Sequence, residues 1–189
     1  MTWYDDLSRI RGDLEANETA ARALIEGLTE QQLNWQAQPG STWSILQCLD
    51  HLALSNRHYT AAMRGRIHRC NQADFPAKGP IRPTALGALF LKNLEPPVSR
   101  RLRAPKAIVP RPASDSGEVL TAFLHSHDDI RAAMDEAAGL DLNRIKFRNP
   151  LLPVLRVRVG TGLLIMAAHE RRHLWQAGRV RKALQAADG

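Results

Sequence analysis

The chain has 189 residues, of which 44% are hydrophobic and 24% are charged, and a formal net charge of +7 at pH 7. These values lie close to the globular average and exclude a wholly disordered or collagen-like chain. The length fits one domain, which we expect to span residues 1–189. The apolar run from Leu163 to Ala168 is only six residues long. A bilayer span needs roughly 20, so no membrane segment is predicted.

The N-terminus and the two cysteines indicate a reducing compartment. The chain opens with acidic residues, Asp5 and Asp6, where a secretory signal needs basic and then apolar residues, so we expect a cytoplasmic protein. Cys48 and Cys70 lie on one predicted helix, where 22 residues separate them by roughly 33 Å, too far for a disulfide. We expect free thiols, with Cys48 packed as a small apolar residue rather than bound to a metal.

Positive charge is concentrated in two segments. Residues 1–50 carry three arginines and eight acidic residues, a net charge of −5. Residues 64–111 carry eleven basic and two acidic residues, and residues 144–182 carry ten basic residues and one glutamate, a net charge of +9 in each segment. Such concentration is typical of surfaces that attract polyanions or acidic small molecules.

A specific nucleic-acid partner is not expected. The basic stretch from Ser99 to Lys106 contains no aromatic residue on which a base can stack, and the chain has no zinc-finger spacing and no helix-turn-helix pattern. A solvated face, or an attraction for an acidic small substrate, is the simpler interpretation of the charge.

Two long helices are predicted in the first part of the chain. The first follows the cap candidate Thr2 and runs for about 25 residues to Gly27, because its apolar residues recur at intervals of three and four. After a Pro-Gly turn, the second follows the cap candidates Ser41 and Ser44. Its apolar stripe continues without a proline for about 27 residues to Cys70.

The next part of the chain is predicted to be a long crossover and a third long helix. Eight prolines interrupt residues 71–117, which leaves room for one short helix at about Thr84 to Leu94. The third long helix follows cap candidates at residues 114–116 and ends near Gly139.

The chain is predicted to end in a fourth long helix. Residues 143–160 contain two prolines and an alternating stretch at 154–159, which fit either a loop or a short extended piece, and we interpret them as a loop. The last helix runs from about Thr161 to Leu184. Four long helices with one long crossover predict an all-α four-helix bundle, in which each apolar stripe is buried by its neighbours. Such bundles place metal and ligand sites between facing helices.

Three histidines are candidates for a metal site. His169 and His173 are four residues apart, so their imidazoles lie one turn apart on one face of the last helix. His51, in the middle of the second helix, can supply a third ligand if the two helices are neighbours. Three neutral nitrogens with open positions for water are typical of catalytic zinc sites. The alternative is that the helical histidine pair is a surface feature with no ligand role.

The segment from His169 to His173 also matches the H-E-x-x-H pattern of zinc proteases, in which Glu170 would be the general base. The sixteen residues after His173 contain no His, Glu or Cys, and Gln176 and Arg179 stand where the extended motif needs Gly and His. We therefore reject the protease interpretation and expect Glu170 to be solvated or paired with an arginine.

The other histidines are weaker candidates. His58 shares nearly the same face as His51 but lies about 10 Å along the helix axis, too far to share an ordinary mononuclear site. His68 lies in a basic run. His125 and His127 point in different directions on a helix, so at most one of them faces the core.

Three segments in a characteristic order carry a family resemblance. They are Leu28–Trp35, then Pro39–Leu52 with Trp-Ser-Ile at 43–45 and His-Leu at 51–52, and finally Ala-His-Glu-Arg-Arg-His-Leu-Trp-Gln at 168–176. They resemble the DinB/YfiT-like family, whose last helix carries Ala-His-Glu-x-x-His-x-x-Gln. The two histidine motifs lie about 120 residues apart, so the resemblance covers nearly the whole chain, and residues 71–115 are its least similar part.

The resemblance implies a four-helix bundle in up-down-down-up order, often dimeric, in which three histidines hold a divalent metal ion. By position these ligands are His51, His169 and His173. Gln176, one turn after His173, is a candidate hydrogen-bond partner of a metal-ligating histidine, and the alternative is an ordinary glutamine on the helix surface. We expect zinc or nickel as the metal and a homodimer as the assembly.

Family members with assigned activities include transferases and isomerases that use mycothiol, bacillithiol or glutathione, and others are described as metal-dependent hydrolases. In thiol transfer the metal lowers the pKa of a low-molecular-weight thiol, so that the thiolate attacks an electrophilic small molecule while basic residues hold its carboxylates. Hydrolysis needs a general base that the sequence does not clearly supply. We therefore expect a metal-dependent thiol transferase. The alternatives are a hydrolase and a non-catalytic stress protein that binds a metal or small ligand.

Overall fold

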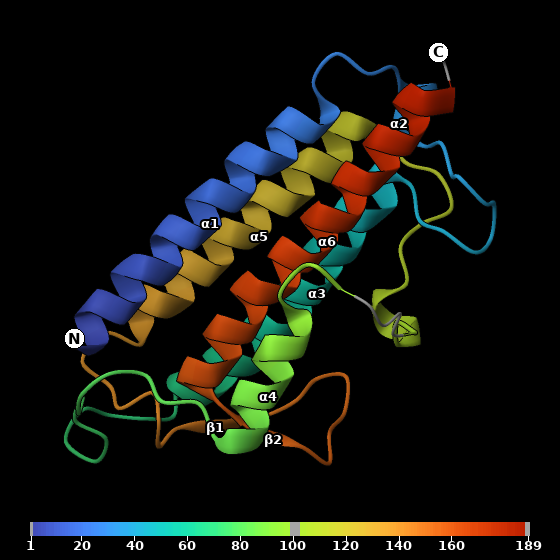
Figure 1. The fold of residues 1–189 in the computed structure, drawn as a ribbon. Coiled ribbons are helices and arrows are strands. Elements are labelled where there is room, and N and C mark those ends of the chain that lie inside the picture. The colour runs from blue at the N-terminus through green and yellow to red at the C-terminus, as the bar shows by residue number, and fades with distance from the viewer. Residues whose placement is uncertain (1, 99–102, 188–189) are drawn as a thin grey trace.

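The structure, a computed structural model, describes residues 2–98 and 103–187 (Figure 1). Helices dominate the described residues, and the sheet is a single pair of short strands. Four long helices form the bundle: α1 (Trp3–Ile25), α3 (Ile45–Ile67), α5 (Ser116–Glu136) and α6 (Val159–Ala187). The predicted all-α four-helix bundle is confirmed.

The four long helices form a ring in which each has two close neighbours. α3 packs against α5 and α6, and α1 packs against the same two helices, whereas α1 and α3 lie diagonally across the bundle. Figure 1 shows that α1 and α6 run in one direction and α3 and α5 in the other. This is the up-down-down-up order, and it places α3 beside α6, the two helices that carry the candidate histidines.

The predicted caps start three of the long helices. The side chains of Thr2 and Ser44 each accept a hydrogen bond from the backbone N–H three residues later, and the side chains of Asp5 and Gln47 complete the two capping boxes. Asp115 caps α5 with its side chain. These local hydrogen bonds satisfy backbone donors that a helix start leaves free, so they set where the helices begin.

The connection after α1 contains a short helix that the sequence analysis did not predict, α2 (Glu30–Leu33), with Thr29 as its N-cap. α3 begins as predicted but ends at Ile67, three residues before the predicted end at Cys70. None of the helices in the described ranges combines the length and apolarity that crossing a bilayer requires.

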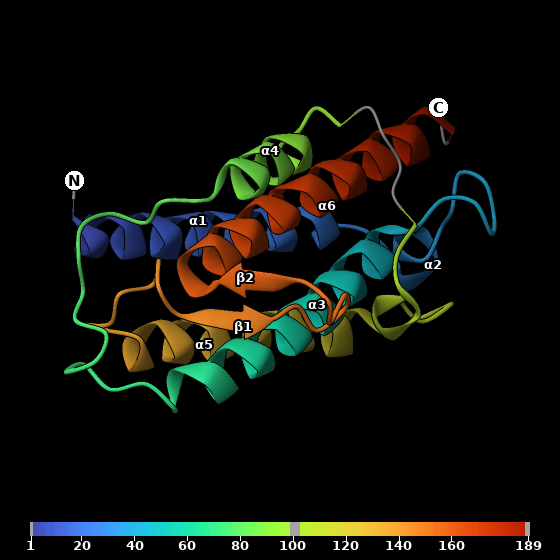
Figure 2. The same ribbon diagram turned by 90° about the horizontal axis from the view of Figure 1, so that it is seen from below.

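The long crossover between α3 and α5 contains the predicted short helix, α4 (Ala85–Leu94), which lies along α6 (Figure 2). A 3₁₀ helix, η1 (Lys106–Ile108), follows and contacts α3. Of the basic stretch from Ser99 to Lys106, residues 99–102 lie outside the described residues. The crossover therefore contacts both histidine-bearing helices.

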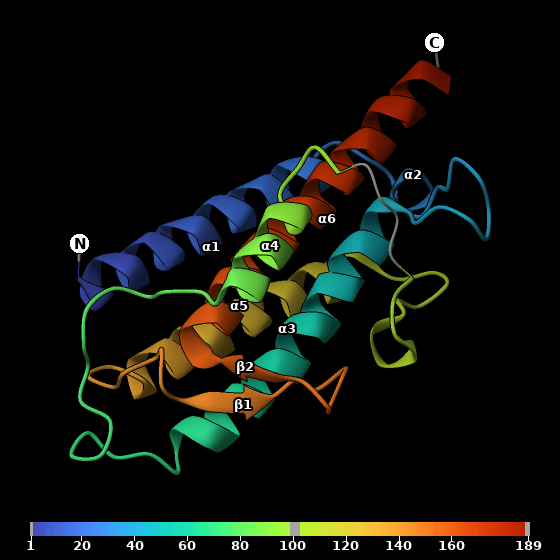
Figure 3. The same cartoon turned by 60° about the horizontal axis from the view of Figure 1, so that its bottom comes forward.

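The interpretation of residues 143–160 as a loop was wrong, and the alternative of a short extended piece holds for two strands. β1 (Lys146–Arg148) and β2 (Arg156–Arg158) pair antiparallel, with Phe147 opposite Val157. Phe147 is buried in the core, and its packing holds strands that are too short to be recognised from alternation alone. β1 contacts α3 and β2 contacts α6, so this hairpin spans the two helices near one end of the bundle (Figure 3).

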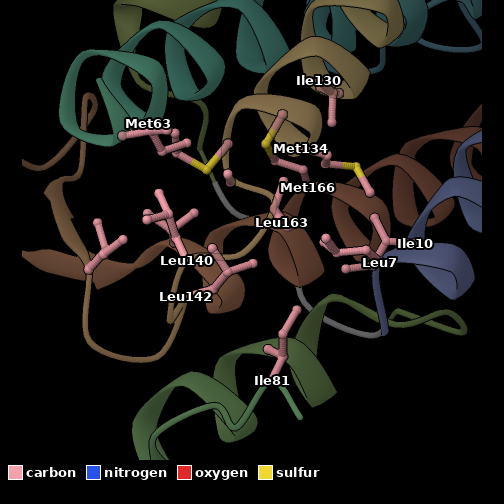
Figure 4. Close-up of a cluster of buried hydrophobic side chains, with 14 of the residues drawn as sticks. Leu7, Ile10, Met63, Ile81, Ile130, Met134, Leu140, Leu142, Leu163 and Met166 are labelled. Carbon is pink, nitrogen blue, oxygen red and sulfur yellow. The ribbon is translucent and has the colours of Figure 1, made fainter. Parts of the chain in front are cut away.

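Two hydrophobic clusters fill the bundle. Figure 4 shows the cluster nearer the hairpin, in which Met63, Leu163 and Met166 meet side chains from α1 and α5. The second cluster contains Cys48 and Phe123. Both cysteines are free, and Cys48 packs in the core as predicted.

Gly162, near the start of α6, marks a close approach of the hairpin. A Cβ atom there would lie 2.8 Å from Cε1 and 2.9 Å from Cζ of Phe147. We expect Gly162→Ala to lower the free energy of unfolding by about 1–3 kcal/mol, measured by urea denaturation, because the ring must move out of its packed position.

The matched control is Gly12→Ala in α1, where an added Cβ meets nothing within 4 Å. Alanine at Gly12 should raise the free energy of unfolding by about 0.5–1 kcal/mol through its higher helix propensity. Stabilisation by both substitutions would contradict the steric role assigned to Gly162.

Candidate metal centre

Three histidine rings from two neighbouring helices converge. His51 on α3 and His169 and His173 on α6 offer ligand nitrogens that all lie within 4.8 Å of one another. The ring centroids of His51 and His173 are 4.5 Å apart, those of His169 and His173 4.6 Å, and those of His51 and His169 5.1 Å. The structure thus brings together all three residues that the sequence pattern selected.

Hydrogen bonds orient two of the three rings. Nδ1 of His51 lies 2.7 Å from the backbone carbonyl of Ile108, so Nδ1 donates its proton there and Nε2 presents its lone pair. Nδ1 of His173 lies 3.1 Å from Oε1 of Gln176, which leaves Nε2 of His173 free in the same way. The contact expected of Gln176 is present, whereas no sequence feature pointed to the carbonyl of Ile108.

Burial favours the neutral form of all three imidazoles. Desolvation lowers the pKa of His51, although two nearby groups act in the opposite direction. Desolvation also lowers the pKa of His169, which keeps part of its surface exposed, and the neighbouring His51 and Arg172 lower it further. The pKa of His173 lies well below its ordinary value because of desolvation and then the other two histidines and Arg172. Neutral imidazole is the form that ligates metal ions.

The donor set and its spacing fit a divalent transition metal. The Nε2 atoms of His51 and His169 are 3.2 Å apart. Two nitrogens bound tetrahedrally to zinc at about 2.0–2.1 Å would lie roughly 3.3 Å apart. The ring of Trp43 lies 4.7 Å from that of His51 and 5.6 Å from that of His173, so an indole covers one side of the rings. Sequence reasoning gave Trp43 no role at the site.

Glu170 faces the interior of the bundle rather than the histidines. The expectation that it is solvated or paired with an arginine was wrong, because its side chain is fully buried. Asn17 on α1 and Asn56 on α3 each donate a hydrogen bond of 2.7 Å, one to each carboxylate oxygen. Adjacent residues of a helix are turned by about 100°, so Glu170 points away from the face that carries His169. It is thus not placed to act as the base of a zinc protease.

The third long helix, α5, contributes His127, which is also fully buried. Its Nε2 lies 3.0 Å from Oε1 of Glu170, but the orientation of the ring does not give a hydrogen bond between these two atoms. Its Nδ1 lies 2.9 Å from Oε1 of Glu18, which also pairs with Arg131. Each long helix therefore supplies one residue to a buried polar layer: Asn17, Asn56, His127 and Glu170.

The remaining histidines lie away from the three converging rings. His58 and His125 are exposed, and His68 contacts Glu136 at 2.8 Å. Of the pair at 125 and 127, only His127 faces the core, which agrees with the expectation that at most one could do so.

An open cavity of about 1540 Å³ lies against the three histidines. Its walls come from α3, α4, α6, the hairpin and the segment around η1. Six basic residues line it, and the lining contains no Asp or Glu among the residues that the structure describes. A small molecule can therefore reach the histidines in surroundings that hold positive but no negative side chains. The basic residues are Arg103, Lys146, Arg156, Arg158, Arg172 and Arg179.

Comparison with known proteins identifies the family of this chain. The family model described as the DinB superfamily matches residues 13–177. This region contains the three histidines, Gln176 and the whole polar layer. No curated protein and no solved structure matches the chain.

Loss of the Glu170 carboxylate would leave the amide groups of Asn17 and Asn56 buried without their acceptor. We expect Glu170→Ala to lower the free energy of unfolding by about 3–5 kcal/mol, measured by urea denaturation. Removing one partner of a buried charged network leaves the other polar groups buried without a hydrogen bond. Glu15→Ala, at an exposed position of α1, is the control and should change stability by less than about 0.5 kcal/mol. Equal stability of the two variants would contradict a structural role for the polar layer.

The lowered histidine pKa values predict how the stability of metal-free protein depends on pH. In the unfolded chain these histidines titrate near about 6.5, so below that pH the unfolded state binds more protons than the folded state. The free energy of unfolding should therefore be greatest above about pH 6.5 and fall on acidification, by up to about 1.4 kcal/mol per pH unit for each histidine that stays neutral.

Urea denaturation with a chelator at pH 7.5 and at pH 5.0 checks this expectation. His169→Ala should show a smaller loss of stability on acidification than the unmodified chain, whereas His125→Ala, at an exposed position, should show the same loss. An unchanged loss in His169→Ala would show that this histidine is not kept neutral by the fold.

Proposed function

Because this chain belongs to the DinB superfamily and its three histidines converge beside an open cavity, we propose that it binds a divalent metal ion through His51, His169 and His173. The support is the spacing of the three ligand nitrogens and the neutral state that burial gives the rings. Zinc or nickel is the proposed metal, since both are commonly bound by imidazole. Gln176 and the carbonyl of Ile108 would hold two of the ligating rings in place.

We further propose that the site catalyses transfer of a low-molecular-weight thiol to an electrophilic small molecule. The metal, when bound, would supply a lowered thiol pKa, which makes a nucleophilic thiolate available near neutral pH. The chain's own residues would enclose the reactants between α3, α4 and α6, and cationic side chains of the lining would hold their acidic groups.

The observation that favours thiol transfer over hydrolysis is the lack of any carboxylate among the described lining residues. Many metal-dependent hydrolases assist the attacking water with a carboxylate base, and the Glu170 carboxylate accepts hydrogen bonds from Asn17 and Asn56 instead. A thiol is much more acidic than water, so a metal needs to lower its pKa only slightly for the thiolate to form near neutral pH.

Elemental analysis of the purified protein tests the metal site. We expect about one equivalent of metal in the unmodified chain, because the three histidines form one mononuclear site. His51→Ala and His169→Ala should each lose nearly all of it while their helical circular dichroism stays unchanged. His125→Ala removes an exposed histidine and should keep the metal. Retention of a full equivalent by either site variant would overturn the three-histidine assignment.

Turnover assays on metal-loaded protein test the reaction. Conjugation of glutathione, mycothiol or bacillithiol to an activated aryl chloride, lost in His169→Ala, is the expected result. Hydrolysis of an activated ester in the absence of thiol, also lost in His169→Ala, would favour the hydrolase instead. A full equivalent of metal without turnover of either kind would indicate a binding protein and contradict the proposed catalysis.

A further inference from the structure

One face of the hairpin carries four cations that repel one another. Alternate residues of a strand share a face, and the register places Lys146 opposite Arg158 and Arg148 opposite Arg156. Like charges directly opposite each other destabilise a strand pair. Repulsion among these four charges therefore destabilises a hairpin whose two strands have only three residues each.

The four cations have no acidic partner in the part of the chain that the structure describes. Within residues 2–98 and 103–187, none of them forms an ion pair with a carboxylate. Nη1 of Arg158 donates to the backbone carbonyl of Arg82 at 3.2 Å, but its Nε is buried with no hydrogen-bond partner. The charge of Arg158 therefore has no compensating carboxylate among the described residues, and an anion in the cavity would supply one.

Three of these cations line the cavity that reaches the histidines. Lys146, Arg156 and Arg158 belong to the cavity wall, whereas Arg148 does not. Tyr59 marks the hairpin end of the cavity, since its hydroxyl accepts a 2.8 Å hydrogen bond from Asn149, the residue after β1. Tyr59 follows His51 by eight residues on α3, so the hairpin end lies about 12 Å along the helix axis from the histidines.

Buried polar atoms lie between these two ends. Ser55 Oγ and Asn56 Oδ1 on α3 and Thr161 Oγ1 on α6 have no hydrogen-bond partner, and all three residues line the cavity. Each of these side chains is more than nine-tenths buried. These atoms are covered by protein, so they make the surroundings of the cavity more polar but do not form part of its surface.

The cavity also has apolar lining residues. Leu86 and Phe90 on α4 and Leu152 and Leu155 in the hairpin turn are large hydrophobic residues with 43–72% of their surface exposed, and all four line the cavity. Exposed apolar side chains gathered around one cavity are typical of a ligand site rather than of scattered surface positions.

We propose that the cavity binds an elongated organic acid, with its anionic group held by Lys146, Arg156 and Arg158 and its apolar body against α4. The far end of this ligand lies at the histidines, about 12 Å from the acid group. The inference rests on the proposed function for the chemistry at that far end and names the substrate class of the same site. Binding of the acid group itself needs no metal.

A small acid fits these residues better than an anionic membrane surface. The three cations line a cavity that also reaches the histidines, and a flat surface cannot enter that cavity. The test below therefore distinguishes binding of a small acid in the cavity from binding to anionic vesicles.

Displacement of a fluorescent aromatic sulfonate, 8-anilinonaphthalene-1-sulfonate, by decanoate tests the proposal with the full chain in a chelator. Decanoate should bind at least about tenfold more tightly than decan-1-ol, because charge-assisted hydrogen bonds hold only the acid. Raising the salt concentration should weaken the binding of decanoate and not of the alcohol. Equal affinity for the acid and the alcohol would overturn the proposal.

The hairpin offers matched variants. Arg156→Gln and Arg158→Gln should each weaken decanoate binding by about tenfold and leave decan-1-ol unchanged. Arg148→Gln removes the same charge directly opposite Arg156 but outside the cavity, so it should change decanoate affinity by less than about twofold. Equal weakening by Arg148→Gln and Arg156→Gln would show a diffuse surface charge and overturn the site.

Two further outcomes separate the proposals. Sedimentation with phosphatidylglycerol vesicles, without displacement of the sulfonate by decanoate, would replace the cavity site with a membrane surface. Decanoate binding with unchanged selectivity in a protein that holds no metal under any loading condition would overturn the metal site alone and uphold the acid site.

Discussion

A carboxylate buried at the centre of the helix bundle constrains the rest of the molecule. Removing a charge from water costs several kcal/mol unless its oxygens are hydrogen-bonded, and the donors for Glu170 come from Asn17 on α1 and Asn56 on α3. Along each helix these polar residues fall between the two hydrophobic clusters. In a purely apolar interior, neighbouring helices could slide and rotate against each other with little penalty. The hydrogen bonds remove that freedom, because they form in only one rotation and one axial position of α6.

The same rotation of α6 orients the histidines. With Glu170 turned inward, His169 and His173 face α3 and the cavity, where His51 meets them. The core and the candidate metal centre therefore depend on one helix orientation. Enclosure then makes the rings neutral, and the two Nε2 atoms, 3.2 Å apart, are positioned before any ion arrives. Ligands arranged in advance lose little conformational freedom on binding.

The long helices and the three histidines could be predicted because their signals are local. Thr2 and Ser44 cap helices through residues three positions away, and the spacing of His169 and His173 is that of one helical turn. The alternation over residues 154–159 was visible but fitted both a loop and an extended piece, since strands of three residues contain too little of it to decide. The burial of Phe147 depends on distant residues and could not be predicted. Glu170 was misjudged because a charged residue is usually solvated, and its partners lie 153 and 114 residues away in the chain.

The crossover contacts His51 through its backbone, because Nδ1 of the His51 ring is hydrogen-bonded to the carbonyl oxygen of Ile108 and not to a side chain. Every amino acid supplies the same backbone oxygen, so substitutions along this segment can alter the cavity wall without disturbing the orientation of the His51 ring. An insertion or deletion in the crossover would instead disturb the orientation of the His51 ring, since it would shift that oxygen. The protein can thus vary the chemistry that surrounds its histidines while the histidines stay where they are.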